Sequence, residues 1–143
     1  MAVRPPSDAA VSLRSLNRRF RGLFAGLGED ESPEALAVRP GADGRSATDH
    51  LVAASDAVVL AGHELDAALG ARGTGPAPAG TTLAERLDEL ARVAGGLADR
   101  VEHTSADEWA ASGALDALWA AIDAAIAHLR DAERTLAEVR GRP

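Results

Sequence analysis

Histidine is the side chain in this sequence best suited to chemistry near neutral pH, because imidazole binds metals and exchanges protons there. The chain holds four histidines, at positions 50, 63, 103 and 128. Counting about 100° per residue along a helix, His50 falls on a flank rich in alanine, and His128 falls at the edge of a leucine- and isoleucine-rich face. We therefore expect both imidazoles to point towards neighbouring helices, which makes His50 and His128 the candidate metal ligands.

A metal site inside a helical protein needs at least three imidazole or carboxylate ligands from facing helices, and a catalytic site also keeps one coordination position open. His50 and His128 supply two, so a third ligand is missing from the sequence pattern. A histidine at a helix interface is also commonly satisfied by a carbonyl group or by water, and this interpretation stays open for both residues. Asp131 follows His128 by three residues and can orient its ring, although such pairs are common on helix surfaces.

Other titratable residues have simpler explanations. Asp49, Asp56 and His63 recur every seven residues and so share one stripe of a helix. That stripe lies largely opposite the aliphatic residues of the same segment, which predicts a solvated face rather than an acid–base row. His103 lies at the expected end of a helix, where capping accounts for it.

Asn17 interrupts an otherwise apolar helix face, four residues after Leu13 and three before Phe20. A buried amide needs hydrogen-bond partners. We therefore name Asn17 as a pocket candidate, with an asparagine at the edge of the core, bonded to backbone or water, as the alternative.

Composition excludes several classes of function. The chain has no cysteine, so disulfides, thiolate ligands and cysteine nucleophiles are absent. It has no Gly-x-Ser-x-Gly turn and no glycine-rich loop between a strand and a helix. The net charge of −7 repels phosphate backbones, and an aromatic content of 3% leaves few platforms for bases. We expect no nucleic-acid partner.

No segment indicates a membrane partner. The apolar run of residues 57–62, which no other run exceeds in length, is far shorter than the roughly twenty residues that a membrane span needs. The N-terminal residues lack the apolar stretch and cleavage site of a secretory signal. Cytoplasmic residence is therefore the expectation.

Four segments carry apolar residues at three- and four-residue spacing, the pattern of an amphipathic helix. The predicted helices span about residues 8–28, 47–69, 83–103 and 114–139. No segment shows the period-two alternation of a strand bounded by hairpin turns. Because each helix has one apolar face, the helices must share a core. The sequence predicts an all-α fold, a four-helix bundle that fills residues 1–143 as one domain.

Local signals mark the helix ends. Ser46 with Asp49, and Thr82 with Glu85, have the spacing of capping boxes. Residues 70–81, GARGTGPAPAGT, are rich in glycine and proline, and about twelve extended residues reach roughly 40 Å. We expect them to form a long crossover between the second and third helices.

Two segments, GRSATDHLVAASDA (residues 44–57) and IAHLRDAERTLAEVR (residues 126–140), resemble the DinB-like superfamily, which includes mycothiol-dependent maleylpyruvate isomerases and related thiol transferases. The resemblance implies a four-helix bundle with one long crossover between helices two and three. Many members hold a divalent metal with a histidine on helix two and with a histidine or glutamate and a histidine, four residues apart, on helix four. His128 matches the last of these ligands, whereas Ala124 and Ala53 stand at the other two positions.

The resemblance leaves two functions open. In the first, which the sequence favours, the bundle has lost the family's metal site, needs no cofactor, and acts as a non-catalytic module that binds a small ligand or another protein, with homodimerisation through helix faces. In the second, the chain is a metal-dependent thiol transferase or isomerase that acts on a thiol of mycothiol type. Zinc or nickel would then bind His50 and His128, because His50 precedes the position of Ala53 by only three residues. Whether the chain is an enzyme stays open.

Overall fold

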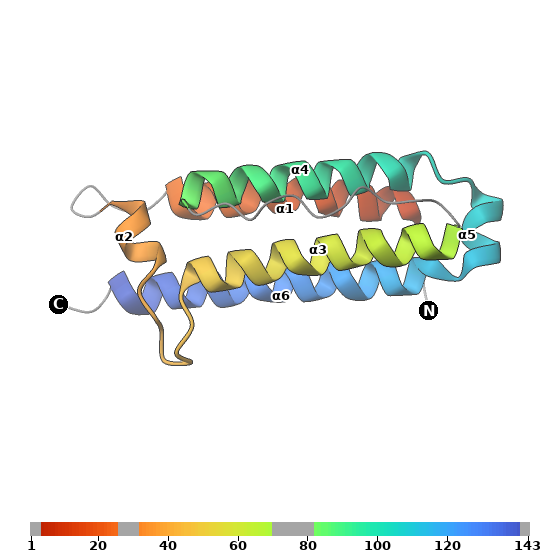
Figure 1. Ribbon diagram of the computed structural model, residues 1–143. Coiled ribbons are helices and arrows are strands. Elements are labelled where there is room, and N and C mark those ends of the chain that lie inside the picture. Colours follow the sequence, from red (N-terminus) through yellow and green to blue (C-terminus); the bar gives the residue numbers. More distant parts are fainter. Residues whose placement is uncertain (1–3, 26–31, 70–81, 141–143) are drawn as a thin grey trace.

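The computed structural model describes residues 4–25, 32–69 and 82–140, and these residues are mostly helical (Figure 1). Within these ranges an isolated bridge pairs Pro40 with Ser46, and there is no strand. The helices in the described residues are α1 (Pro6–Ala25), α2 (Pro33–Ala37), α3 (Ala47–Leu69), α4 (Leu83–Glu102), α5 (Ala106–Ser112) and α6 (Ala114–Arg140). The predicted all-α class is confirmed.

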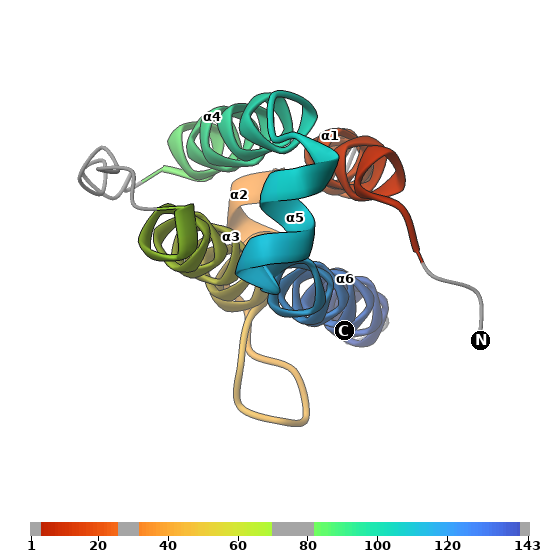
Figure 2. The same ribbon diagram turned by 90° about the vertical axis from the view of Figure 1, so that its right-hand side faces the viewer.

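The four long helices, α1, α3, α4 and α6, lie alongside one another (Figure 1). Seen end-on, each of them neighbours two others, so that α1 and α3 lie across a diagonal (Figure 2). The most extensive interface joins α3 to α6, and the next joins α1 to α4. These helices correspond to the four predicted from periodicity, although the predicted end of the first helix at Gly28 lies outside the described residues.

Helices α3 and α4 run in the same direction, whereas α1 and α6 run in the opposite one (Figure 1). The end of α3 and the start of α4 therefore lie at opposite ends of the molecule. The predicted crossover, residues 70–81, lies outside the described residues.

The helix starts follow the local signals in the sequence. The Ser46 N–H donates to Asp49 Oδ2 at 2.9 Å, and the Asp49 N–H donates to Ser46 Oγ at 3.1 Å, so a reciprocal pair satisfies the start of α3. The equivalent pair of Thr82 and Glu85 begins α4. Both predicted capping boxes are confirmed.

Helix α5 is an element that apolar periodicity did not resolve. A capping box between Ser105 and Glu108 begins it, and Gly113, with a φ of 64°, ends it in the left-handed conformation that glycine adopts without strain. The chain then turns by 88° into α6. As a result, α5 lies across one end of the long helices (Figure 2).

The core is made of aliphatic side chains with many alanines and few aromatic rings. Alanine allows the helices to approach closely, and the larger side chains contribute about 1.5–3 kcal/mol each on burial. The largest apolar side chains that are fully buried are Phe20, Leu13, Leu16, Leu51, Leu65, Leu90, Leu129, Leu136, Val101 and Val139.

In the described part of the chain, no helix taken alone has the length and apolar character of a membrane span. Only the bent pair α5–α6 reaches that length and apolar character, when its two helices are counted together.

Candidate metal centre

His50 lies in the first turns of α3, where its backbone N–H donates to the Ser46 carbonyl oxygen at 3.2 Å. Its side chain is only 1% exposed. Among the described residues, neither ring nitrogen has a hydrogen-bond partner. A buried polar group without a hydrogen-bond partner lowers the stability of the fold by roughly 1–3 kcal/mol, so a buried imidazole without such partners needs an explanation.

His128 lies on α6, opposite His50. Their ring centroids are 5.8 Å apart, with the ring planes tilted by 34°. Nδ1 of His128 is also buried without a hydrogen-bond partner in the described residues. The packing of α3 against α6 thus brings together the two histidines that the sequence singled out.

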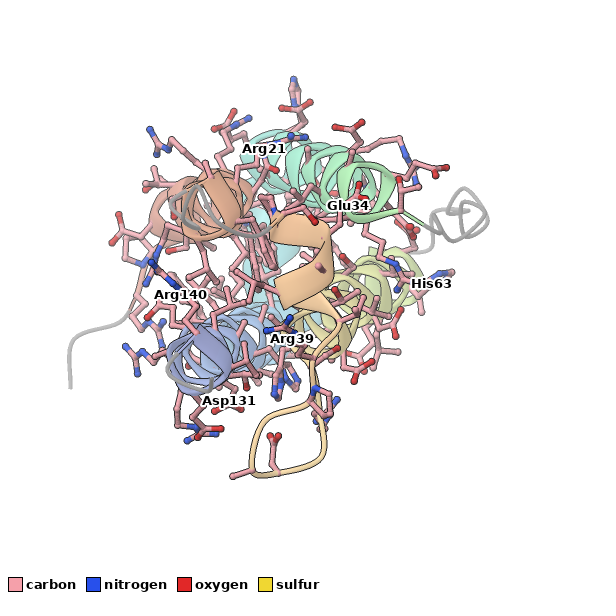
Figure 3. The ribbon with its side chains drawn as sticks, turned by 90° about the vertical axis from the view of Figure 1, so that its left-hand side faces the viewer. Arg21, Glu34, Arg39, His63, Asp131 and Arg140 are labelled. Carbon is pink, nitrogen blue, oxygen red and sulfur yellow. The ribbon has the colours of Figure 1, made fainter. Side chains whose placement is uncertain are left out.

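Asp131 completes a group of three. One ligand atom each from His50, His128 and Asp131 lies within 4.8 Å of the others. Asp131 is one turn beyond His128 on α6 and is half-buried, and Arg134 binds its Oδ1 at 3.0 Å. Figure 3 shows Asp131 on the outer side of α6, on the same side of the molecule as the loop between α2 and α3. Two imidazoles and one carboxylate from two helices are a donor set that suits zinc and similar divalent metals.

The electrostatics of His128 favour its neutral form. Burial lowers the pKa of His128 below its ordinary value, because the charged ring would lose water, and the nearby His50 and Arg45 lower it further. Asp131 opposes this shift by attracting a proton to the ring. Since a metal binds only neutral imidazole, the environment keeps His128 in the form that a metal needs.

A second carboxylate, that of Asp43, approaches His50 from the loop between α2 and α3. Its Oδ2 lies 3.3 Å from His50 Nε2 without completing a hydrogen bond. Its Oδ1 accepts the Arg45 backbone N–H at 2.9 Å. That hydrogen bond, followed by the nearby His50, lowers the pKa of Asp43. Asp43 is therefore held as a carboxylate beside the buried imidazole.

The remaining sequence candidates lie elsewhere. Asn17 is half-buried, and its Oδ1 accepts a hydrogen bond from Arg21 Nε at 3.1 Å on the same helix. A role for Asn17 in a pocket stays a prediction. His63 is exposed on α3, well away from Asp131 (Figure 3). His103 caps α4, with Nδ1 2.6 Å from the Asp99 carbonyl oxygen, as its position at the helix end indicated.

The sequence offered unequal signals for the two carboxylates. Asp131 stands in a His-x-x-Asp pattern that places both side chains on one helix face, but only the docking of α3 shows that His50 joins them. Asp43 has no spacing relation to either histidine, because a loop carries it to His50. Ala53 and Ala124 have no side-chain donor atom and contribute nothing to the group.

Comparison with protein-family models, with curated proteins and with solved structures finds no significant match for this chain. The resemblance to the DinB-like superfamily therefore stays a prediction from the sequence.

Proposed function

We propose that this protein is a four-helix bundle of DinB type that binds a divalent transition metal, zinc or nickel, through His50, His128 and Asp131. The observation that carries the proposal is the convergence of three ligand atoms within 4.8 Å, two of them from buried or half-buried imidazoles with unpartnered nitrogens. A metal that accepts the imidazole lone pairs would remove the cost of burying them unpaired.

The arrangement also offers an account of the alanines at two of the family's ligand positions. His50 lies three residues nearer the start of α3 than Ala53, and Asp131 lies seven residues nearer the end of α6 than Ala124. Because α3 and α6 run in opposite directions, both displacements lead towards the same end of the molecule (Figure 1). The donor set is thus consistent with a family site displaced along one helix pair, with His128 common to both versions.

This geometry favours the second of the two functions that the sequence left open. Three protein ligands leave a fourth coordination position for a bound molecule, as in catalytic zinc sites. A divalent metal there would supply Lewis-acid chemistry and would lower the pKa of a bound thiol. We accordingly propose a metal-dependent transferase or isomerase that acts on a low-molecular-weight thiol of mycothiol type.

Metal titration of the purified full chain, after treatment with a chelator, tests the site. We expect one equivalent of zinc or nickel to bind by calorimetry and to raise the melting temperature. His128→Ala should lower the affinity at least 100-fold, since it removes one of three ligands. His63→Ala is the matched control, because it removes an exposed imidazole from α3. A wild-type chain without saturable binding, or His128→Ala with unchanged affinity, would contradict the proposal.

Turnover is a separate measurement. Conjugation of mycothiol to a reactive acceptor should disappear with chelator and return with added zinc. Metal binding without turnover under any of these conditions would favour the non-catalytic module, whose homodimerisation and small-ligand binding can be measured by sedimentation and thermal shift.

A further inference from the structure

The loop between α2 and α3, residues 38–46, is attached to α6. The Ala42 backbone N–H donates to Glu138 Oε2 at 2.9 Å, and the Gly41 N–H donates to the Arg45 carbonyl oxygen at 2.9 Å within the loop. A Cβ at Gly41 would lie only 2.7 Å from Glu138 Oε2, so a side chain at position 41 would push the Glu138 carboxylate away from the Ala42 N–H. The loop is therefore held in a fixed position on the helix that carries His128 and Asp131.

That attachment places the next residue, Asp43, beside His50. Oδ2 of Asp43 is 3.3 Å from Nε2 of His50, and the hydrogen bond from Arg45 fixes the other carboxylate oxygen. Asp43 does not belong to the group whose ligand atoms lie within 4.8 Å of one another. It thus reaches the imidazole of His50 without joining His128 and Asp131.

An imidazole that binds a metal through one nitrogen carries a proton on the other. A carboxylate that accepts this second N–H selects the tautomer, fixes the ring orientation and strengthens the ligand. His50 has no other partner in the described residues for either nitrogen, so Asp43 is the group available for this role.

We propose that Asp43 is a positioning residue for the metal site: its carboxylate accepts the Nε2–H of His50, which leaves Nδ1 as the metal ligand. Glu138 supports this arrangement by holding the loop through Ala42. The inference rests on the proposed function, since it assigns a role towards the metal that His50, His128 and Asp131 would bind.

Zinc affinity, measured by competition with a chromogenic chelator on the full chain, tests the role of Asp43. We expect Asp43→Asn to bind one zinc ion about 10–100-fold more weakly than the wild type. Asp56→Asn, which neutralises an exposed carboxylate on α3, is the matched control and should leave the affinity unchanged. Glu138→Ala should weaken zinc binding by a smaller factor, because it releases the loop and removes no ligand.

The tautomer of His50 gives a readout that needs no metal. In ¹⁵N-edited NMR spectra of the chelator-treated protein, we expect the wild-type ring to carry its proton on Nε2, and Asp43→Asn to lose that preference. Asp43→Glu should restore part of both the preference and the affinity.

The outcomes separate the two proposals. Wild-type zinc binding combined with an unchanged affinity in Asp43→Asn, or with an Nδ1-protonated His50, would overturn the role of Asp43 and leave the metal site intact. A wild-type chain that binds neither zinc nor nickel would overturn the proposed function itself.

Discussion

The α1–α4 and α3–α6 interfaces treat their polar side chains in opposite ways. Between α1 and α4 the polar groups lie at the exposed rim and are paired: Arg14 binds Asp99 and Glu102, and Arg21 binds Asp88. Among the described residues of α1 and α4, no buried side-chain nitrogen or oxygen lacks a hydrogen-bond partner. This interface has the properties expected of a structural contact.

Between α3 and α6, by contrast, imidazole nitrogens of His50 and His128 are buried and unpaired. Such groups cost folding free energy, and proteins accept that cost mainly at sites that bind something. The difference teaches that the α1–α4 pair provides stability, whereas the α3–α6 pair gives up some stability by burying the imidazoles that we propose as ligands.

The largest expected effect tests the structural side of this comparison. Phe20 is fully buried on α1, so Phe20→Ala should lower the free energy of unfolding by about 3–5 kcal/mol in urea titrations followed by circular dichroism. Val11→Ala is the control, because Val11 is 64% exposed on the same helix. A loss below about 1 kcal/mol for Phe20→Ala would show that α1 contributes little to the core.

The next prediction concerns the cost of the buried imidazole. His50→Leu replaces a buried imidazole, whose Nδ1 has no partner without a metal, by apolar atoms of similar size, so the metal-free protein should be up to about 1 kcal/mol more stable despite the loss of the contact with Asp43. The same variant should lose the rise in melting temperature that we expect zinc to cause in the wild type. A metal-free variant less stable than the wild type would mean that the contact between His50 and Asp43 outweighs the cost of burying the imidazole.

Acid should weaken the folded state through His128. Its pKa is lowered in the folded protein from an ordinary value of 6.5, so its contribution to stability is full above that pH and is lost as the pH falls through the folded pKa. We expect the unfolding free energy of the metal-free wild type to fall between about pH 7 and pH 5, and His128→Gln to flatten this dependence. If the unfolding free energy fell equally with pH in both proteins, His128 would not be the group responsible. Asp43 and Glu102 act only at lower pH, because their pKa values are lowered from 3.8 and 4.5.

The smallest effect is expected at the rim. Arg14→Gln breaks exposed ion pairs with Asp99 and Glu102, and such pairs are screened by salt and contribute little. The melting temperature of Arg14→Gln should be slightly lower than that of the wild type at low salt. In about 0.5 M sodium chloride the two melting temperatures should match, because surface ion pairs are screened at that ionic strength. A large loss at high salt would place this rim among the stabilising features of the α1–α4 interface.

The helices could be predicted from the sequence because their determinants are local. Apolar residues at three- and four-residue spacing marked the long helices. Ser46 and Asp49, which are close enough in sequence to form hydrogen bonds with each other, marked the start of α3. Helix α5 escaped the same reasoning, since seven residues are too few for a clear period, although Ser105 and Glu108 carried a readable capping signal.

The candidate site could be predicted only in part. Helical periodicity predicted that His50 and His128 point inward. The axial register between α3 and α6 does not follow from local spacing, however, and that register decides whether His50 meets His128 and Asp131. Asp43 was out of reach for a further reason, because its position depends on a tertiary hydrogen bond between Ala42 and Glu138. Local periodicity therefore names candidate ligands, and long-range docking selects the set.

The close approach of Gly41 to Glu138 has a consequence for how related sequences should vary. A methyl group at position 41 would meet both the Glu138 carboxylate at 2.7 Å and Thr135 Cγ2 at 3.1 Å. A side chain at position 41 would displace the Glu138 carboxylate from the Ala42 N–H, so chains that hold the loop through an acidic residue at position 138 should keep glycine at position 41. Covariation of positions 41 and 138 among related sequences would indicate that selection maintains the close packing of this loop against α6.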